Sequence, residues 1–149
     1  MAIVGLADKA VAESRERVRA ALHAVGLALP SKRITVNLSP ADLPKEGSHY
    51  DLPIALGLLT VMGVLPAPEM ASHMALGELS LDGSLRPIKG ALPISIQARK
   101  EKFKGFILPK TNAREAAIVN DVEIYGVENL REAIDVLAGE SEIKPLIVN

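Results

Sequence analysis

The chain has 149 residues, no cysteine, and 17 Lys and Arg against 18 Asp and Glu, which gives a formal net charge of -1. This length, with 48% hydrophobic and 23% charged residues, predicts one soluble globular domain and excludes a disordered or disulfide-stapled chain. The balanced charge excludes a global attraction to nucleic acid. The lack of cysteine suits a cytoplasmic protein, and the absence of a long apolar run predicts that no segment spans a membrane.

The first part of the chain predicts a strand end, a helix and a second strand. Residues 1–5 are apolar, as at the end of a strand. Asp8 is a suitable N-cap for a helix whose apolar residues recur every three or four positions until Gly26. Apolar and polar residues alternate from residue 34 to residue 38, which predicts a half-buried strand before a polar loop.

A buried helix is expected near the centre of the domain. Asp51 can cap its N-terminus, and Pro53 suits its first turn, where a missing amide proton costs little. Residues 54–61 are apolar nearly all round, which predicts that this helix is covered on every side.

The second half predicts further strands and helices. Asn112, with Glu115 three residues later, has the spacing of a capping box and predicts the start of a short helix. Residues 1–138 are therefore expected to form one α/β (α+β) domain with a single mixed sheet covered by helices, followed by a tail or linker over residues 139–149. The other expected elements are a hairpin of residues 74–81 and 84–87 around a turn at Asp82-Gly83, helices over 91–102 and 128–137, and strands over 105–108 and 122–125.

A nucleotide-binding loop is not expected in this chain. Such a loop needs glycines at a fixed spacing followed by Lys-Ser or Lys-Thr, so that backbone amides and an ammonium group converge on phosphates. Residues 83–90 have the wrong spacing, and Pro87 stands where an amide donor is needed. No cofactor is therefore expected in this chain.

Ser48, His49 and Asp51 are the residue types of a hydrolytic triad, but neighbours within one loop rarely meet in the required geometry. The simpler interpretation is a loop followed by a helix cap. No metal site is expected, because the three histidines (His23, His49 and His73) are far apart in the sequence.

Two basic stretches are the candidates for a binding surface: Lys32, Arg33 and Lys45 around the long loop, and Arg86 with Lys89 after the hairpin. Both follow predicted strands, so they could line one edge of the sheet and hold a phosphate backbone or an acidic partner. The alternative interpretation is an ordinary solvated face.

Four segments of the chain resemble one known family: IVGLADKAVAESRERVRAAL, RITVNLSPADLPKEGSHYDLPIALGLL, GELSLDGSLRPIKGALP and GFILPKTNAREA. Together they resemble the N-terminal domain of the magnesium-chelatase-like AAA+ proteins, the ComM or YifB family, from Ile3 to about Leu137. The strands that normally precede Ile3 in this family are missing. The resemblance implies a parent protein that is a hexameric, ATP-dependent DNA helicase of natural transformation, with ATP and magnesium bound in a separate AAA+ module.

The resemblance also implies a fold, that of domain 2 of ribosomal protein S five, which the Lon proteolytic domain shares. Aligned with Lon-type proteases, the position of the nucleophilic serine falls on His49 and that of the activating lysine on Leu92. Leucine has no basic atom, so the residues at these two positions cannot perform the Ser-Lys mechanism. A shifted dyad of Ser48 and Lys89 would need both loops to change register.

The first functional hypothesis is accordingly a non-catalytic accessory domain that contacts DNA or a partner. The alternatives are a Lon-like peptidase with a displaced dyad and a purely structural module for ring assembly.

Overall fold

The computed structural model describes residues 2–4, 8–27, 35–37, 50–119, 121–140 and 143–146. Its helices are α1 (Asp8–Ala24), α2 (Asp51–Val61), α3 (Ala67–Ser72), α4 (Ala91–Lys100), α5 (Lys110–Ala116) and α6 (Leu130–Ala138). Its strands are β1 (Ala2–Val4), β2 (Thr35–Asn37), β3 (His73–Ala75), β4 (Glu78–Leu79), β5 (Leu85–Arg86), β6 (Gly105–Pro109) and β7 (Glu123–Val127). None of the described helices is long and apolar enough to cross a bilayer.

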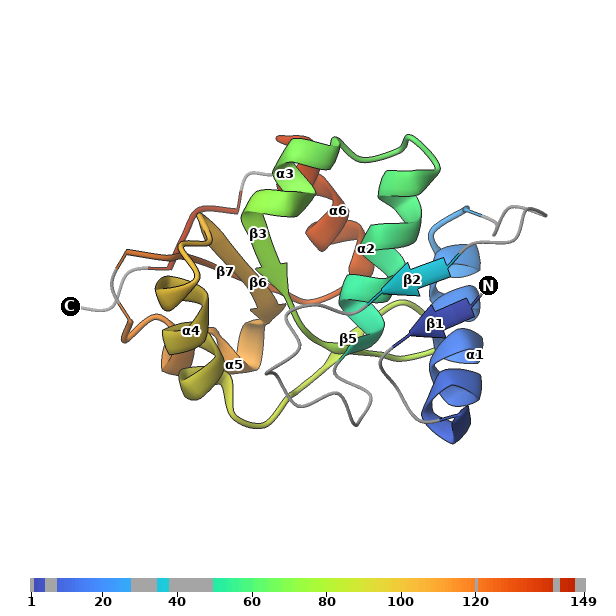
Figure 1. The fold of residues 1–149 in the computed structure, drawn as a ribbon, viewed down its shortest axis with the longest axis horizontal. Helices are drawn as coiled ribbons and strands as arrows, with labels where there is room; N and C mark the ends of the chain where they lie inside the picture. Colours follow the sequence, from blue (N-terminus) through green and yellow to red (C-terminus); the bar gives the residue numbers. More distant parts are fainter. Residues whose placement is uncertain are drawn as a thin grey trace.

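A parallel sheet of β3, β6 and β7 lies between two layers of helices (Figure 1). Helices α4 and α5 lie on one side of this sheet, and α2 and α6 lie on the other. Helix α1 packs against α2, which also contacts β2 of the parallel pair formed by β1 and β2. The predicted class, a mixed α/β fold with a sheet covered by helices, is confirmed.

The described strands form three separate sheets in place of the single mixed sheet expected from the sequence. The expected strand over residues 74–81 is interrupted at Gly77, whose carbonyl oxygen accepts a hydrogen bond from the Leu52 N–H group (3.0 Å). Before Gly77 the chain pairs with β6, and after it Glu78 and Leu79 pair with β5. The hairpin around Asp82-Gly83 is confirmed, and Gly83 has the positive φ (+91°) that favours glycine in a tight turn.

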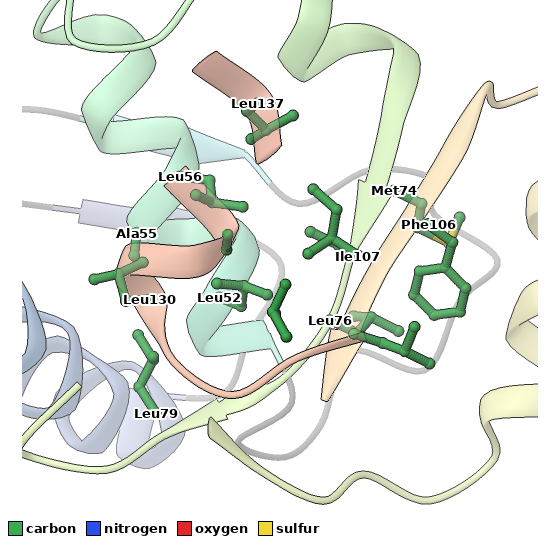
Figure 2. Packing of buried hydrophobic residues seen from close by; sticks show 14 of the residues in the cluster. Leu52, Ala55, Leu56, Met74, Leu76, Leu79, Phe106, Ile107, Leu130 and Leu137 are labelled. Carbon is green, nitrogen blue, oxygen red and sulfur yellow. The ribbon is translucent and has the colours of Figure 1, made fainter. Parts of the chain in front are cut away.

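The core lies on both faces of the parallel sheet (Figure 2). Along β6, Ile107 points toward α2 and α6, whereas its neighbour Phe106 points to the opposite face together with Met74. This is the two-residue alternation of a strand whose two faces are both covered. Helix α2 is central, as predicted, and its fully buried apolar residues are Leu52, Ile54, Ala55, Leu56, Leu58 and Leu59.

Two predicted helix caps are wrong. Tyr50 is the N-cap of α2, and Asp51 lies inside the first turn with its side chain turned to residues of α1 and β4. Pro109 is the N-cap of α5, so Asn112 lies within the helix and bonds to a distant loop. Both side chains bond to residues that are distant in the sequence.

Helix α6 is capped by Asn129, and the Glu132 side chain of its first turn bonds to the residue before the cap. The Asn129 side chain accepts a hydrogen bond from the Glu132 N–H group (2.9 Å), and the Glu132 side chain accepts one from the Glu128 N–H group (2.7 Å). Helix α6 therefore begins at Leu130, two residues after the predicted start. The short helix α3, which the sequence analysis did not predict, carries Pro68 in its first turn, where proline is tolerated.

Candidate functional site

The predicted site residues divide into two groups. Arg86, Lys89 and Leu92 belong to the connection between β5 and α4, which the structure describes. The others, Lys32, Arg33, Lys45, Ser48 and His49, lie outside the described residues. The convergence of the two basic stretches stays a prediction for that reason.

The connection from β5 to α4 presents two exposed cations. Arg86 is the last residue of β5, faces Glu78 in the ladder, and forms a long ion pair with it (Nε to Oε2, 3.9 Å). The Arg86 side chain remains 67% exposed, so water screens this pair and leaves most of the guanidinium accessible. Lys89 is also exposed, two residues before α4 begins. Both cations could contact an anionic partner from this connection.

Asn112 and Glu115 of α5 hold this connection in place. The Asn112 carboxamide accepts a hydrogen bond from the Ile88 N–H group (2.9 Å) and donates one to the Ile88 carbonyl oxygen (2.9 Å). The Glu115 carboxylate accepts a hydrogen bond from the Leu92 N–H group (3.1 Å) in the first turn of α4. The backbone register between Ile88 and Leu92 is therefore fixed at both ends by one helix.

Because the register is fixed, the side chain at the position of the activating lysine in a Ser-Lys dyad can be identified. Leu92 is half-buried at that position and has no basic atom. Lys89 lies three residues earlier, is exposed to water, and follows a residue that Asn112 holds by both backbone groups. A general base for serine needs a desolvated amine, and the described part of this connection shelters none.

A buried ion pair lies where the predicted triad carboxylate was expected. Asp51 is 0% exposed, and both of its oxygens accept hydrogen bonds from the Arg17 guanidinium of α1. The same carboxylate accepts a hydrogen bond from the Leu79 N–H group of β4 (3.0 Å). The hydrogen bond to Asp51 is the main reason why the pKa of Arg17 is raised above its ordinary value. Asp51 therefore links α1, α2 and β4, and its role is structural.

Metal binding finds no support in the described residues, where no three His, Asp or Glu side chains come together. The sequence analysis missed the positioning role of Asn112 and Glu115, and the partner of Arg17. The spacing of Asn112 and Glu115 was visible in the sequence, but their actual partners lie 24 and 23 residues away.

Comparison with known proteins gives two kinds of relative. Residues 1–112 match the family described as subunit ChlI of Mg-chelatase. The chain is 42% identical to the competence protein ComM of Haemophilus influenzae over 141 residues and 38% identical to the YifB protein of Escherichia coli over 144 residues. These alignments cover 95% and 97% of this chain but only 28% of each relative.

The second kind of relative is a protease. The chain is 27% identical to Lon protease 2 of Bacillus subtilis over 124 residues, which are 82% of this chain and 22% of that protein. The resemblances stated from the sequence, to ComM and YifB and more distantly to Lon, are thus confirmed. The chain spans between a fifth and a third of the length of each of these relatives.

Proposed function

Because the chain belongs to the family of the Mg-chelatase subunit ChlI, with ComM and YifB among its relatives, we propose that it is a non-catalytic accessory domain of a longer AAA+ ATPase that processes DNA. ATP and magnesium are held by a separate module of that protein, since this chain has no phosphate-binding loop. The similarity to ComM, a competence protein, supports a role in competence. The proposed parent assembles as a cytoplasmic hexameric helicase.

One observation carries the non-catalytic part of this proposal. Leu92 stands at the position of the Lon lysine, and its N–H group is bonded to Glu115 of α5. Sliding Lys89 into that position would break this hydrogen bond and both hydrogen bonds between Asn112 and Ile88. The loss of three such bonds costs on the order of 3 kcal/mol, which opposes a displaced dyad.

The binding surface in this proposal is the exposed cationic connection of Arg86 and Lys89, together with Lys32, Arg33 and Lys45. Replacing these residues with Glu in the full-length protein should weaken DNA binding and flatten its dependence on salt, because fewer counterions are released. Binding isotherms that do not change would remove this surface from the proposal.

The accessory role is tested on the longer protein. An in-frame phosphate-binding loop encoded downstream of Asn149 would establish that an ATPase is attached. Deleting residues 1–149 should then leave ATP hydrolysis largely intact and abolish DNA unwinding or branch migration. If ATP hydrolysis and unwinding are both unaffected, this chain is not an accessory domain for DNA processing; a loss of hexamer assembly with no loss of DNA binding would instead indicate a purely structural role.

The similarity to Lon protease 2 keeps one alternative open, a peptidase with a displaced dyad of Ser48 and Lys89. If the chain were such a peptidase, a serine-directed reagent would label Ser48. The chain would also cleave casein, and Ser48→Ala and Lys89→Met would each abolish this cleavage. We expect neither, because Lys89 is exposed.

A further inference from the structure

An open cleft of about 870 Å³ lies between α5 and the segment of residues 143–146. Arg114 and Lys110 line it from α5, and Lys144 lines it from the C-terminal segment. Glu128 and Glu132, which follow β7, also line it. The lining of this cleft therefore includes three cationic and two anionic side chains.

The two carboxylates have local partners. Glu128 forms an ion pair with Lys110 (Oε1 to Nζ, 3.1 Å), and Glu132 accepts a hydrogen bond from the Glu128 N–H group. Arg114 and Lys144 are exposed, and neither has a hydrogen bond or an ion pair to another described residue. The three cations and two carboxylates of the lining leave a net formal charge of +1, and Arg114 and Lys144 are its two cations without a bonded partner among the described residues.

Both free cations are carried by anchored backbone. Arg114 lies on α5, whose residues Ala113 and Ala116 are buried against the core. Lys144 lies between Ile143, which packs against the core, and Leu146, whose N–H group donates a hydrogen bond to the Ile124 carbonyl oxygen (2.8 Å). A ligand that binds between them therefore has little backbone to order, which lowers the cost of binding.

We propose that this cleft binds the sugar-phosphate backbone of duplex nucleic acid, with Arg114 and Lys144 contacting phosphates. The inference rests on the proposed function and adds a second contact site to it. Arginine and lysine without internal partners are the usual phosphate contacts of proteins, and no aromatic side chain lines the cleft to stack on bases.

The helix that carries Arg114 also supports the cationic connection described above. Asn112, two residues before Arg114, holds Ile88 between Arg86 and Lys89. One helix therefore supports both sets of cations. Phosphate contacts from these cations recognise the backbone without reading its sequence.

The test measures binding of the 149-residue chain to a fluorescent DNA duplex by anisotropy over a series of salt concentrations. The double variant Arg114→Glu/Lys144→Glu should bind about tenfold more weakly at low salt, and the slope of log K against log salt should fall in magnitude by about two. The variant Arg114→Gln/Lys144→Gln should change both quantities in the same direction. The matched control is Arg99→Glu/Lys100→Glu, which reverses two exposed cations of α4 outside the cleft and should leave the slope nearly unchanged.

Other outcomes overturn the proposal in distinguishable ways. If wild type binds the duplex and the cleft variants bind it equally well, the cleft is not a DNA site, while the proposed function stands through Arg86 and Lys89. If wild type binds no duplex even at the lowest salt, DNA contact by this chain fails altogether. If labelled oligoglutamate binds in a manner that requires Arg114 and Lys144 and the duplex does not bind, the cleft receives an acidic protein instead.

Discussion

Asn112 satisfies both backbone groups of Ile88 with a single side chain, although the two residues are 24 positions apart. The amide oxygen accepts the Ile88 N–H group, and the amide nitrogen donates to the Ile88 carbonyl oxygen. This double contact fastens the loop before α4 to α5. It gives the connection that carries Arg86, Lys89 and Leu92 a fixed position.

Substituting Asn112 should measure the value of this contact. Asn112→Ala removes both hydrogen bonds, and we expect the free energy of unfolding to fall by about 2 kcal/mol in urea titrations. Asn112→Asp can still accept the Ile88 N–H group but cannot donate to its carbonyl oxygen, so it should lose at least about 1 kcal/mol. The exposed neighbour Thr111 is the control, and a Thr111→Ala loss as large as that of Asn112→Ala would contradict the assignment.

The ion pair of Arg17 and Asp51 gives a second prediction. Arg17→Ala leaves a fully buried carboxylate without its cation, and we expect a loss of about 3 kcal/mol in the free energy of unfolding. The double variant Arg17→Leu/Asp51→Leu should lose less than the sum of the two single losses, because no isolated charge remains buried.

Arg19 is the matched control for Arg17 on the same helix. Its ion pair with Glu16 (3.5 Å) is exposed, so Arg19→Ala should change the free energy of unfolding by less than about 0.5 kcal/mol. Equal losses for Arg17→Ala and Arg19→Ala would show that the buried pair does not stabilise the fold.

The local elements of this fold could be predicted because their signals lie within a few residues of one another. The periodicity of α1 and the turn at Asp82-Gly83 are examples. The sequence has the Asn-x-x-Glu spacing three times, beginning at Asn112, Asn120 and Asn129, and the Asn129 side chain caps a helix in the described structure. Asn112 and Glu115 have the same spacing but bond to a distant loop.

The candidate site was predictable to a different extent. The absence of a lysine at position 92 could be read from the sequence together with the Lon resemblance. The hydrogen bonds that hold this position could not be predicted from the sequence. The partners of Asn112 and Glu115 are more than 20 residues away and become neighbours only when α4 packs on α5. The cleft of Arg114 and Lys144 was missed for the same reason, since it joins α5 to a segment beyond α6.

Two glycines give opposite predictions for substitution by alanine. A Cβ atom on Gly126 would lie 2.8 Å from the Ala113 Cβ atom and 3.1 Å from the Lys110 Cα atom, so α5 would have to move away from β7. We expect Gly126→Ala to lower the free energy of unfolding by about 2 kcal/mol. A Cβ atom on Gly57, inside α2, would meet no described atom within 4 Å, so Gly57→Ala should stabilise the protein by about 0.5–1 kcal/mol.

Thermal and urea unfolding of Gly126→Ala and Gly57→Ala measure the two changes in the free energy of unfolding. A stabilising Gly126→Ala would mean that α5 does not approach β7 as closely as described. The same substitution should also disturb the cleft, because Gly126 forms part of its lining.

Tyr125 should ionise at unusually high pH. Burial, followed by its hydrogen bond to Glu123 (2.8 Å), raises its pKa from 10.0 to about 12. A raised pKa means that the folded state favours the neutral phenol, so this contribution to stability is fully present below pH 10 and is lost as the pH rises toward 12. The chain has two tyrosines, and Tyr50→Phe leaves Tyr125 as the one phenol that an absorbance titration reports.

Glu123→Gln tests the contribution of the Glu123 charge to this shift. Removing the carboxylate takes away its charge, so the pKa of Tyr125 should fall, yet it should stay above 10.0 because burial is the larger cause. If Tyr125 has an ordinary tyrosine pKa in the single variant Tyr50→Phe, its ring is exposed and burial does not raise the pKa. A titration that Glu123→Gln leaves unchanged would show that the charge of Glu123 does not contribute, because a glutamine amide oxygen at this position can still accept the hydrogen bond of Tyr125.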